Sequence, residues 1–234
     1  MPDLRPPVLL RLSRVLTRIR TRGPKEVLTL ARQRLQQWVR SEDELILFFR
    51  PTERLEVDRD DLDLVWADDS HAEAYARDIG SDSAASFSSR LADDVWCLLV
   101  VAEGRLVHAS WVTTSGAWTR EVDGYLCPPP GGAYIYESFT RDDSRGRGIY
   151  PFALAGIVTG LKSKAVDQAW VAVEAHNEPS RRAIGKAGFE ERFRISYRRR
   201  LGRLRVDGSK MAHMGLYKGN KQADNLFRKR VSRP

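Results

Sequence analysis

The sequence has few of the residues that mark metal, redox or membrane proteins. Of its 234 residues only two are cysteines, Cys97 and Cys127, and they lack the C-x-x-C spacing of a zinc or dithiol site. The longest apolar runs, such as Val95–Ala102, are far shorter than the ~20 residues that cross a bilayer. The arginine-rich amino terminus also lacks the apolar stretch of a signal peptide. We therefore expect a cytoplasmic protein with two reduced thiols and no metal.

Charge is distributed unevenly along the chain. Residues 1–40 carry ten Lys and Arg against two Asp and Glu, residues 41–143 carry eight against 22, and residues 144–234 carry 21 against seven. A basic carboxyl-terminal third favours phosphorylated ligands, and an acidic middle could attract a cationic amine. The alternative is that the two regions neutralise each other. Nucleic-acid binding is not expected, because a solvated strand edge and a flexible end explain the arginines at 198–200 and the basic tail more simply.

The amino-terminal region has the period of two basic amphipathic helices. Leu9, Leu12, Leu16 and Ile19 recur at helical spacing, and a second stripe follows the break at residues 23–24. Such a hairpin could pack on its own domain, lie on an anionic membrane or dock an acidic carrier protein. We predict an extension over residues 1–42, an α/β domain over 43–206 and a basic tail over 207–234.

Strand patterns dominate the first half of the predicted domain. Residues 44–50 and 62–66 read as strands, residues 71–91 as a broken helical stretch containing Gly80, and 95–102 with 106–113 as a hairpin. From residue 133 the pattern changes to strand 133–140, glycine turn, helix 149–162 and strand 169–174. This β-α-β unit predicts a parallel strand pair. A helix over 179–187 and a strand over 189–201 complete a mixed, mostly antiparallel sheet with flanking helices.

A glycine-rich turn joins strand 133–140 to the next helix. Its residues are Arg145, Gly146, Arg147, Gly148, Ile149 and Tyr150. A turn of this kind directs backbone N–H groups and the positive end of the helix at one point, which binds phosphate. Glycines permit unusual backbone angles there, and the arginines add positive charge.

Three motifs in order resemble the GNAT N-acyltransferases. They are RGRGIY at residues 145–150, NEPS at residues 177–180 after the next strand, and GF at residues 188–189 closing the following helix. The resemblance covers roughly residues 95–201. It implies the GNAT fold with a splayed parallel strand pair, acetyl-CoA as co-substrate, and acyl transfer to a primary amine of a small molecule or peptide.

The resemblance also implies roles for particular residues. Backbone groups of Ser138, Phe139 and Thr140 would hold the pantetheine arm, and the turn would hold the pyrophosphate. Asn177 would contact the arm near its thiol end and Ser180 would line the same helix, although both residues also suit ordinary helix capping. The sequence departs from the family at Tyr150, where a small residue is usual and whose side chain must point away from phosphate. It departs again at Ile184, where many members have a tyrosine that protonates the leaving thiolate.

The catalytic groups follow from the chemistry of the reaction. An alkyl amine has a pKa near ~10, so a base must take its proton. Glu137 is the candidate, because it lies on the strand that carries the arm-holding residues. Strand alternation places Tyr136 and Ser138 on the opposite side. The alternative is that Glu137 is solvated or pairs with an arginine. Donors for the thiolate are Tyr150, Ser180 or Tyr134, and His108 and His176 are further titratable candidates.

Two other functions are compatible with the same fold. The acyl donor could be bound to an acidic carrier protein that docks on the amino-terminal helices. The missing tyrosine at Ile184 instead suggests a non-catalytic module that binds acyl-CoA. The sequence does not identify the amine that accepts the acyl group.

Overall fold

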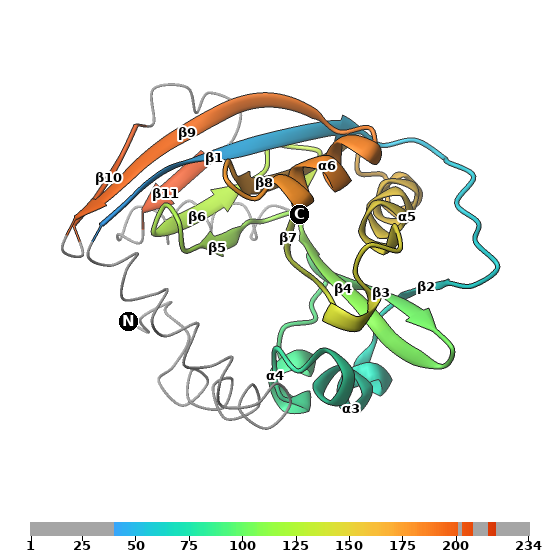
Figure 1. The fold of residues 1–234 in the computed structure, drawn as a ribbon. Helices are drawn as coiled ribbons and strands as arrows, with labels where there is room; N and C mark the ends of the chain where they lie inside the picture. The colour runs from blue at the N-terminus through green and yellow to red at the C-terminus, as the bar shows by residue number, and fades with distance from the viewer. Residues whose placement is uncertain (1–39, 201–202, 208–214, 219–234) are drawn as a thin grey trace.

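The computed structural model describes residues 40–200, 203–207 and 215–218. The predicted amino-terminal helical hairpin and most of the predicted tail lie outside these residues. One sheet has eight strands in the order β10-β9-β1-β8-β7-β4-β3-β2, and a second has three in the order β11-β6-β5 (Figure 1). The strands are β1 (Arg40–Pro51), β2 (Asp63–Trp66), β3 (Val95–Ala102), β4 (Arg105–Thr113), β5 (Ala117–Thr119), β6 (Gly124–Cys127), β7 (Gly132–Thr140), β8 (Gln168–Glu174), β9 (Glu190–Arg200), β10 (Arg203–Val206) and β11 (Gly215–Lys218).

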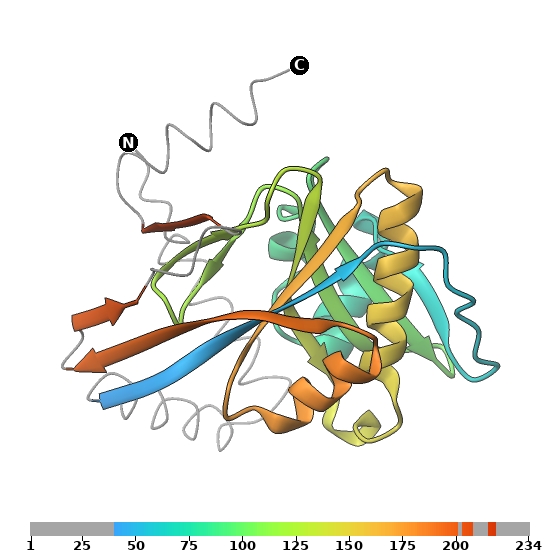
Figure 2. The ribbon, with the colours of Figure 1, turned by 90° about the horizontal axis from the view of Figure 1, so that it is seen from above.

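Helices cover both faces of the large sheet. The helical elements are η1 (Asp69–His71), α3 (Ala72–Ala74), η2 (Tyr75–Ile79), α4 (Ala84–Ser88), η3 (Asp142–Ser144), α5 (Ile149–Ser163) and α6 (Glu178–Lys186). Figure 1 shows α5 and α6 on one side of the strands, and α3 and α4 on the other; Figure 2 shows α5 alongside the strands from above. Among the described residues no helix is both long and apolar enough to cross a membrane.

Alternating side chains of β3 divide the core into two layers. Leu98 and Val100 pack toward α5, and Cys97 and Leu99 pack toward the helices on the opposite face. Because strand side chains alternate between faces, a strand buried on both sides must be apolar throughout. This explains the unbroken apolar run of the sequence at this position. Both cysteines are buried, and they do not form a disulfide with each other.

The predicted fold class is confirmed. In the described residues every named strand pair of the two sheets is antiparallel except β7 with β8, which are parallel and joined through α5. The β3–β4 hairpin turns at Glu103 and Gly104, both with positive φ (51° and 72°). The second sheet was not predicted, because strands of three or four residues carry too short a pattern to be recognised. The proposed domain boundaries remain predictions.

Two features of β7 open the sheet beside β8. Pairing between the two strands ends at Ile135 and Val171, although β7 continues to Thr140 and β8 to Glu174. On its other edge β7 contains a bulge, since Tyr136 pairs with Trp111 and Phe139 with Ala109. Two residues of β7 therefore oppose one residue of β4, which bends the strand.

The bulge corrects one sequence prediction about Glu137. Its φ is 48°, a value that non-glycine residues rarely adopt. Alternation is broken at this point, and Tyr136 and Glu137 both approach Arg90 instead of facing opposite sides. Ser138 does face the other way, because its hydroxyl bonds the Ser110 hydroxyl on the α5 side. The two-residue period of a strand, when it is read from the sequence, does not reveal such a bulge.

Candidate functional site

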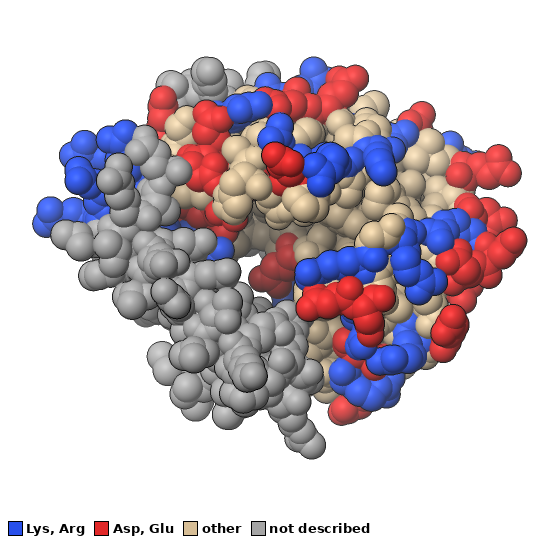
Figure 3. Space-filling view, viewed as in Figure 1, with Lys and Arg blue, Asp and Glu red and all other residues tan. Residues whose placement is uncertain are grey.

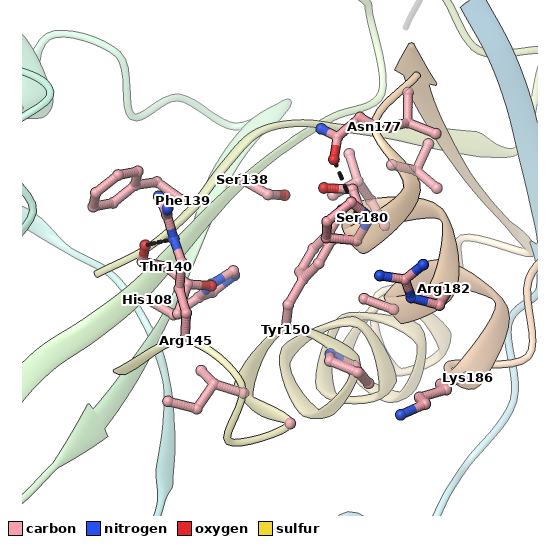
Figure 4. A pocket seen from close by; sticks show the side chains of 18 of the residues that line it. His108, Ser138, Phe139, Thr140, Arg145, Tyr150, Asn177, Ser180, Arg182 and Lys186 are labelled. Carbon is pink, nitrogen blue, oxygen red and sulfur yellow. Dashed lines mark hydrogen bonds between the residues drawn. The ribbon is translucent and has the colours of Figure 1, made fainter. Parts of the chain in front are cut away.

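A cavity of about 760 Å³ lies where the β7–β8 gap meets the first turns of α5 and α6 (Figure 4). Its walls come from the second half of β7, the glycine turn, the end of β8 and one side of α6. All the predicted binding and catalytic residues except Arg147 line it: Glu137, Ser138, Phe139, Thr140, Arg145, Gly146, Gly148, Ile149, Tyr150, Asn177 and Ser180. The fold thus brings together segments that are about 40 residues apart in the chain.

Beyond Ile135, no strand among the described residues pairs with the edge of β7 that faces β8. Ser138, Phe139 and Thr140 line the cavity beyond the last β7–β8 pair, and Val171 and Val173 line it from β8. An exposed strand edge binds an extended chain by adding it as another strand. A linear ligand with amide groups could therefore lie along β7.

The glycine turn leads into the amino terminus of α5, a kind of position at which helices bind anions. Gly146 and Gly148 have φ of 79° and 74°, and Gly148 is the N-cap of α5. Gly148 makes no side-chain cap hydrogen bond at the start of this 15-residue helix, and Gly148, Ile149 and Tyr150 line the cavity. Arg145 lines the cavity, where its Nη2 pairs with Asp142 Oδ1 at 2.7 Å.

Arg147 is placed differently from the prediction. Its guanidinium lies 3.6 Å from Asp61 Oδ2, and its carbonyl accepts a hydrogen bond from Arg59 Nη1 at 2.9 Å. The side chain does not line the cavity. Its backbone lies in the turn between Gly146 and Gly148, both of which have positive φ.

The amino terminus of α6 is capped by Asn177. The side-chain Oδ1 accepts a hydrogen bond from the Ser180 N–H at 3.2 Å, so the capping role considered from sequence is confirmed. Both residues also line the cavity. One turn further along α6, Ile184 is fully buried in the core. The position at which the GNAT pattern often has a tyrosine is therefore filled by a buried aliphatic side chain that does not line the cavity.

Tyr150 occupies the middle of the cavity. Figure 4 shows its ring pointing from the start of α5 toward Ser138 and Ser180, away from the glycine turn. Burial raises the pKa of Tyr150 to about 12, and the hydrogen bond with Ser138 acts in the opposite direction. The phenol is thus protonated at neutral pH and can donate a hydrogen bond into the cavity.

A buried polar network supports the same wall. His108 is fully buried, with Nδ1 2.7 Å from Thr140 Oγ1 and Nε2 2.8 Å from Ser110 Oγ. Its ring stacks on Tyr150 with centroids 5.4 Å apart. Burial lowers the pKa of His108 to about 3, so the imidazole is neutral. Ser110 was missed by sequence reasoning; two polar residues alternating in an apolar strand were the signal that could have found it.

Glu137 is held by an arginine, as the alternative interpretation stated. Arg90 Nη2 lies 2.8 Å from Glu137 Oε2, and Arg90 Nη1 lies 2.5 Å from Asp82 Oδ2. The guanidinium is 3.8 Å from the ring centroid of Trp111. The Arg90 and Asp82 side chains are 14% and 1% exposed, whereas that of Glu137 is 49% exposed. The Glu137 carboxylate is therefore fixed from one side and open from the other.

His176 lies outside the cavity lining. Its Nδ1 contacts Asp43 Oδ2, and its Nε2 is 3.9 Å from Glu174 Oε2. The hydrogen bond with Asp43 raises the pKa of His176. These three side chains are close enough to hold a metal ion, but they already engage one another, and the Tyr197 hydroxyl donates to Glu174 Oε1 at 2.8 Å.

No family model matches the sequence, and no curated protein matches it. Solved structures with a similar fold include a GCN5-related N-acetyltransferase from Sphaerobacter thermophilus, with 16% identity, a TM-score of 0.49, and coverage of 74% of this chain and 56% of that one. The Escherichia coli ribosomal-protein-S18-alanine N-acetyltransferase has 14% identity, a TM-score of 0.44, and coverage of 56% and 79%. An aminoglycoside N-acetyltransferase in complex with CoA has 16% identity, a TM-score of 0.46, and coverage of 59% and 94%. The chain spans less than two thirds of the length of several structures that it matches.

Proposed function

We propose that this chain is a GNAT-type N-acyltransferase that moves an acetyl or related acyl group from CoA to a primary amine. The observation that carries the proposal is the continuity of one cavity. It joins the part of β7 that extends past its pairing with β8 to the amino terminus of α5, where Gly148 provides no side-chain cap. An acyl-CoA needs both features, because its pantetheine arm is a linear diamide and its pyrophosphate is an anion.

The two halves of the donor bind to different walls. The pantetheine amides pair with the backbone of Ser138 to Thr140, as an added strand would. The pyrophosphate meets the N–H groups after Gly148, with Arg145 beside it. Asn177, at the start of α6, contacts the arm near its thiol end.

Glu137 is the proposed base. The amine nitrogen attacks the thioester carbonyl carbon, the C–N bond forms, the C–S bond breaks, and the amine proton passes to the Glu137 carboxylate directly or through water. Arg90 occupies Oε2 and keeps the carboxylate at the β7 bulge. Because half of the Glu137 side chain is exposed, an acceptor can approach it from solvent.

Tyr150 is the proposed donor to the leaving thiolate. It takes the role of the tyrosine that many GNAT members have at the position of Ile184. Here Ile184 is buried, whereas Tyr150 lines the cavity. With its pKa near 12 the phenol keeps its proton at neutral pH. A thiol has a pKa near ~8.5, so a hydrogen bond from the phenol is enough to assist departure of the sulfur.

The test is release of free CoA from acetyl-CoA by the purified chain, against a panel of amino sugars, amino acids, polyamines and peptide amines. Amine-dependent release that falls about 100-fold in Glu137→Gln is expected from loss of a general base. Lys162→Gln is the control, because Lys162 lies at the end of α5, pairs only weakly with Asp167 at 3.5 Å and does not line the cavity. Release unchanged by Glu137→Gln would remove Glu137 as the base.

A second candidate is a non-catalytic acyl-CoA-binding module, which the burial of Ile184 favours. Titration calorimetry separates the two. Tight CoA binding without release for any amine would support the module, and absence of CoA binding would refute both functions.

A further inference from the structure

Two basic side chains of α6 line the cavity away from the glycine turn. Arg182 and Lys186 are four residues apart, so they lie on one face of the helix. Pro179 and Ala183 line the cavity from the same face. In Figure 4 both basic residues stand on the α6 side, across the pocket from Arg145. From Asn177 to Lys186 the helix rises ~13 Å, so Lys186 is well separated from the thiol end of the cavity.

Positive charge dominates this cavity. Arg145, Arg182 and Lys186 line it, whereas Glu137 is the one acidic residue among the described lining residues and is paired with Arg90. Arg182 Nη1 lies 3.0 Å from Glu178 Oε2, but both side chains are at least 65% exposed, so that pair is weak. Lys186 has no ion-pair partner within the part of the chain that the structure describes. Figure 3 shows basic side chains both over α6 and over the turn region, with uncharged surface between them.

The two cations on α6 are not needed for the pyrophosphate. That group is met by backbone N–H groups of α5 and by Arg145, which belong to a different segment. A second pair of cations on another helix fits a second, separate anionic group. Lysine and arginine are the usual side-chain partners of phosphate, and CoA carries one further phosphate, on the 3′ position of its ribose.

We propose that Arg182 and Lys186 bind the 3′-phosphate of CoA and make the site selective for CoA thioesters over carrier-bound phosphopantetheine. The inference rests on the proposed donor function. A carrier-bound arm has a single phosphodiester and no nucleotide, so it leaves both cations without a partner. The basic amino-terminal segment that the sequence predicts to be helical would then have a role other than carrier recognition.

The test compares three ligands by titration calorimetry at low ionic strength: CoA, dephospho-CoA and 4′-phosphopantetheine. The wild type is expected to bind CoA about tenfold more tightly than dephospho-CoA, which is the scale of two partly exposed charge contacts. Arg182→Gln with Lys186→Gln should bring that ratio close to one by weakening CoA alone. Lys162→Gln removes one positive charge outside the cavity and should leave the ratio unchanged.

The outcomes separate this inference from the donor function. Equal binding of CoA and dephospho-CoA by the wild type, with acyl transfer intact, would overturn the inference and leave the proposed function standing. A ratio that survives the double substitution would also overturn it. If none of the three ligands binds, the donor function fails and the inference fails with it.

Discussion

Replacing Arg90 with glutamine tests how the fold holds the proposed base. Arg90 joins Asp82, which is almost fully buried, to Glu137, which is half exposed. The substitution keeps a polar side chain but removes the positive charge. Asp82 then keeps the Ser86 hydroxyl at 3.4 Å and loses its guanidinium partner.

The expected loss of stability follows from this asymmetry. Removing one partner of a buried ion pair leaves an uncompensated buried charge and costs about 3–5 kcal/mol. Loss of the guanidinium over Trp111 acts in the same direction. Glu137→Gln breaks only the Arg90–Glu137 pair, at its exposed end, and leaves the Arg90–Asp82 pair in place, so it should cost less than about 1 kcal/mol. Both substitutions remove the Arg90–Glu137 pair, but only Arg90→Gln also removes the Arg90–Asp82 pair, so their costs should differ by several kcal/mol.

Urea unfolding of the full chain at pH 7, followed by tryptophan fluorescence and circular dichroism, measures the difference. Lys162→Gln is the control for loss of an exposed cation and should stay within about 0.5 kcal/mol of the wild type. The double variant Arg90→Gln with Asp82→Asn should recover part of the loss, because it removes the orphaned charge. If Arg90→Gln cost no more than Glu137→Gln, the pairing of Arg90 with Asp82 would not be the stabilising contact.

Three further results are expected. Tyr150→Phe should lower kcat about 100-fold while KM for acetyl-CoA changes little, since it removes a proton donor and keeps the ring; an unchanged kcat would exclude the phenol as donor. Gly146→Ala and Gly104→Ala should each lower the free energy of unfolding by about 1–2 kcal/mol, because both glycines have positive φ and open space at the Cβ position. Only Gly146→Ala should also weaken CoA binding in calorimetry. Equal CoA affinity in the two variants would contradict the proposed phosphate site. NMR should show that His108 stays neutral from pH 7 to about 4. The free energy of unfolding should fall as the pH drops from 6.5 toward 3, because the imidazole binds a proton in the unfolded chain but not in the folded one. Titration of His108 near pH 6.5 would contradict its burial.

The half of the candidate site that we propose to bind phosphate could be predicted from the sequence because it is local. Arg145 to Tyr150 are consecutive, the two glycines permit positive φ, and a helix begins at the next residue. The Asn177 cap is local in the same way. Backbone preferences over a few residues decide such features, and their order along a β-α-β unit then predicts the parallel pair β7 and β8.

The catalytic half depended on contacts between distant segments. Arg90 and Glu137 are 47 residues apart in the sequence, and no sequence pattern near either residue predicts that they form an ion pair. The bulge at Glu137 arises from the register between β7 and β4, which places two residues opposite one and turns Tyr136 toward Arg90. The burial of Ile184 and the side of α6 that bears Lys186 follow from how α6 packs beside α5. Local preferences act on neighbours in the chain, whereas register and packing are set by the whole core, so only the folded structure shows which charges meet in the cavity.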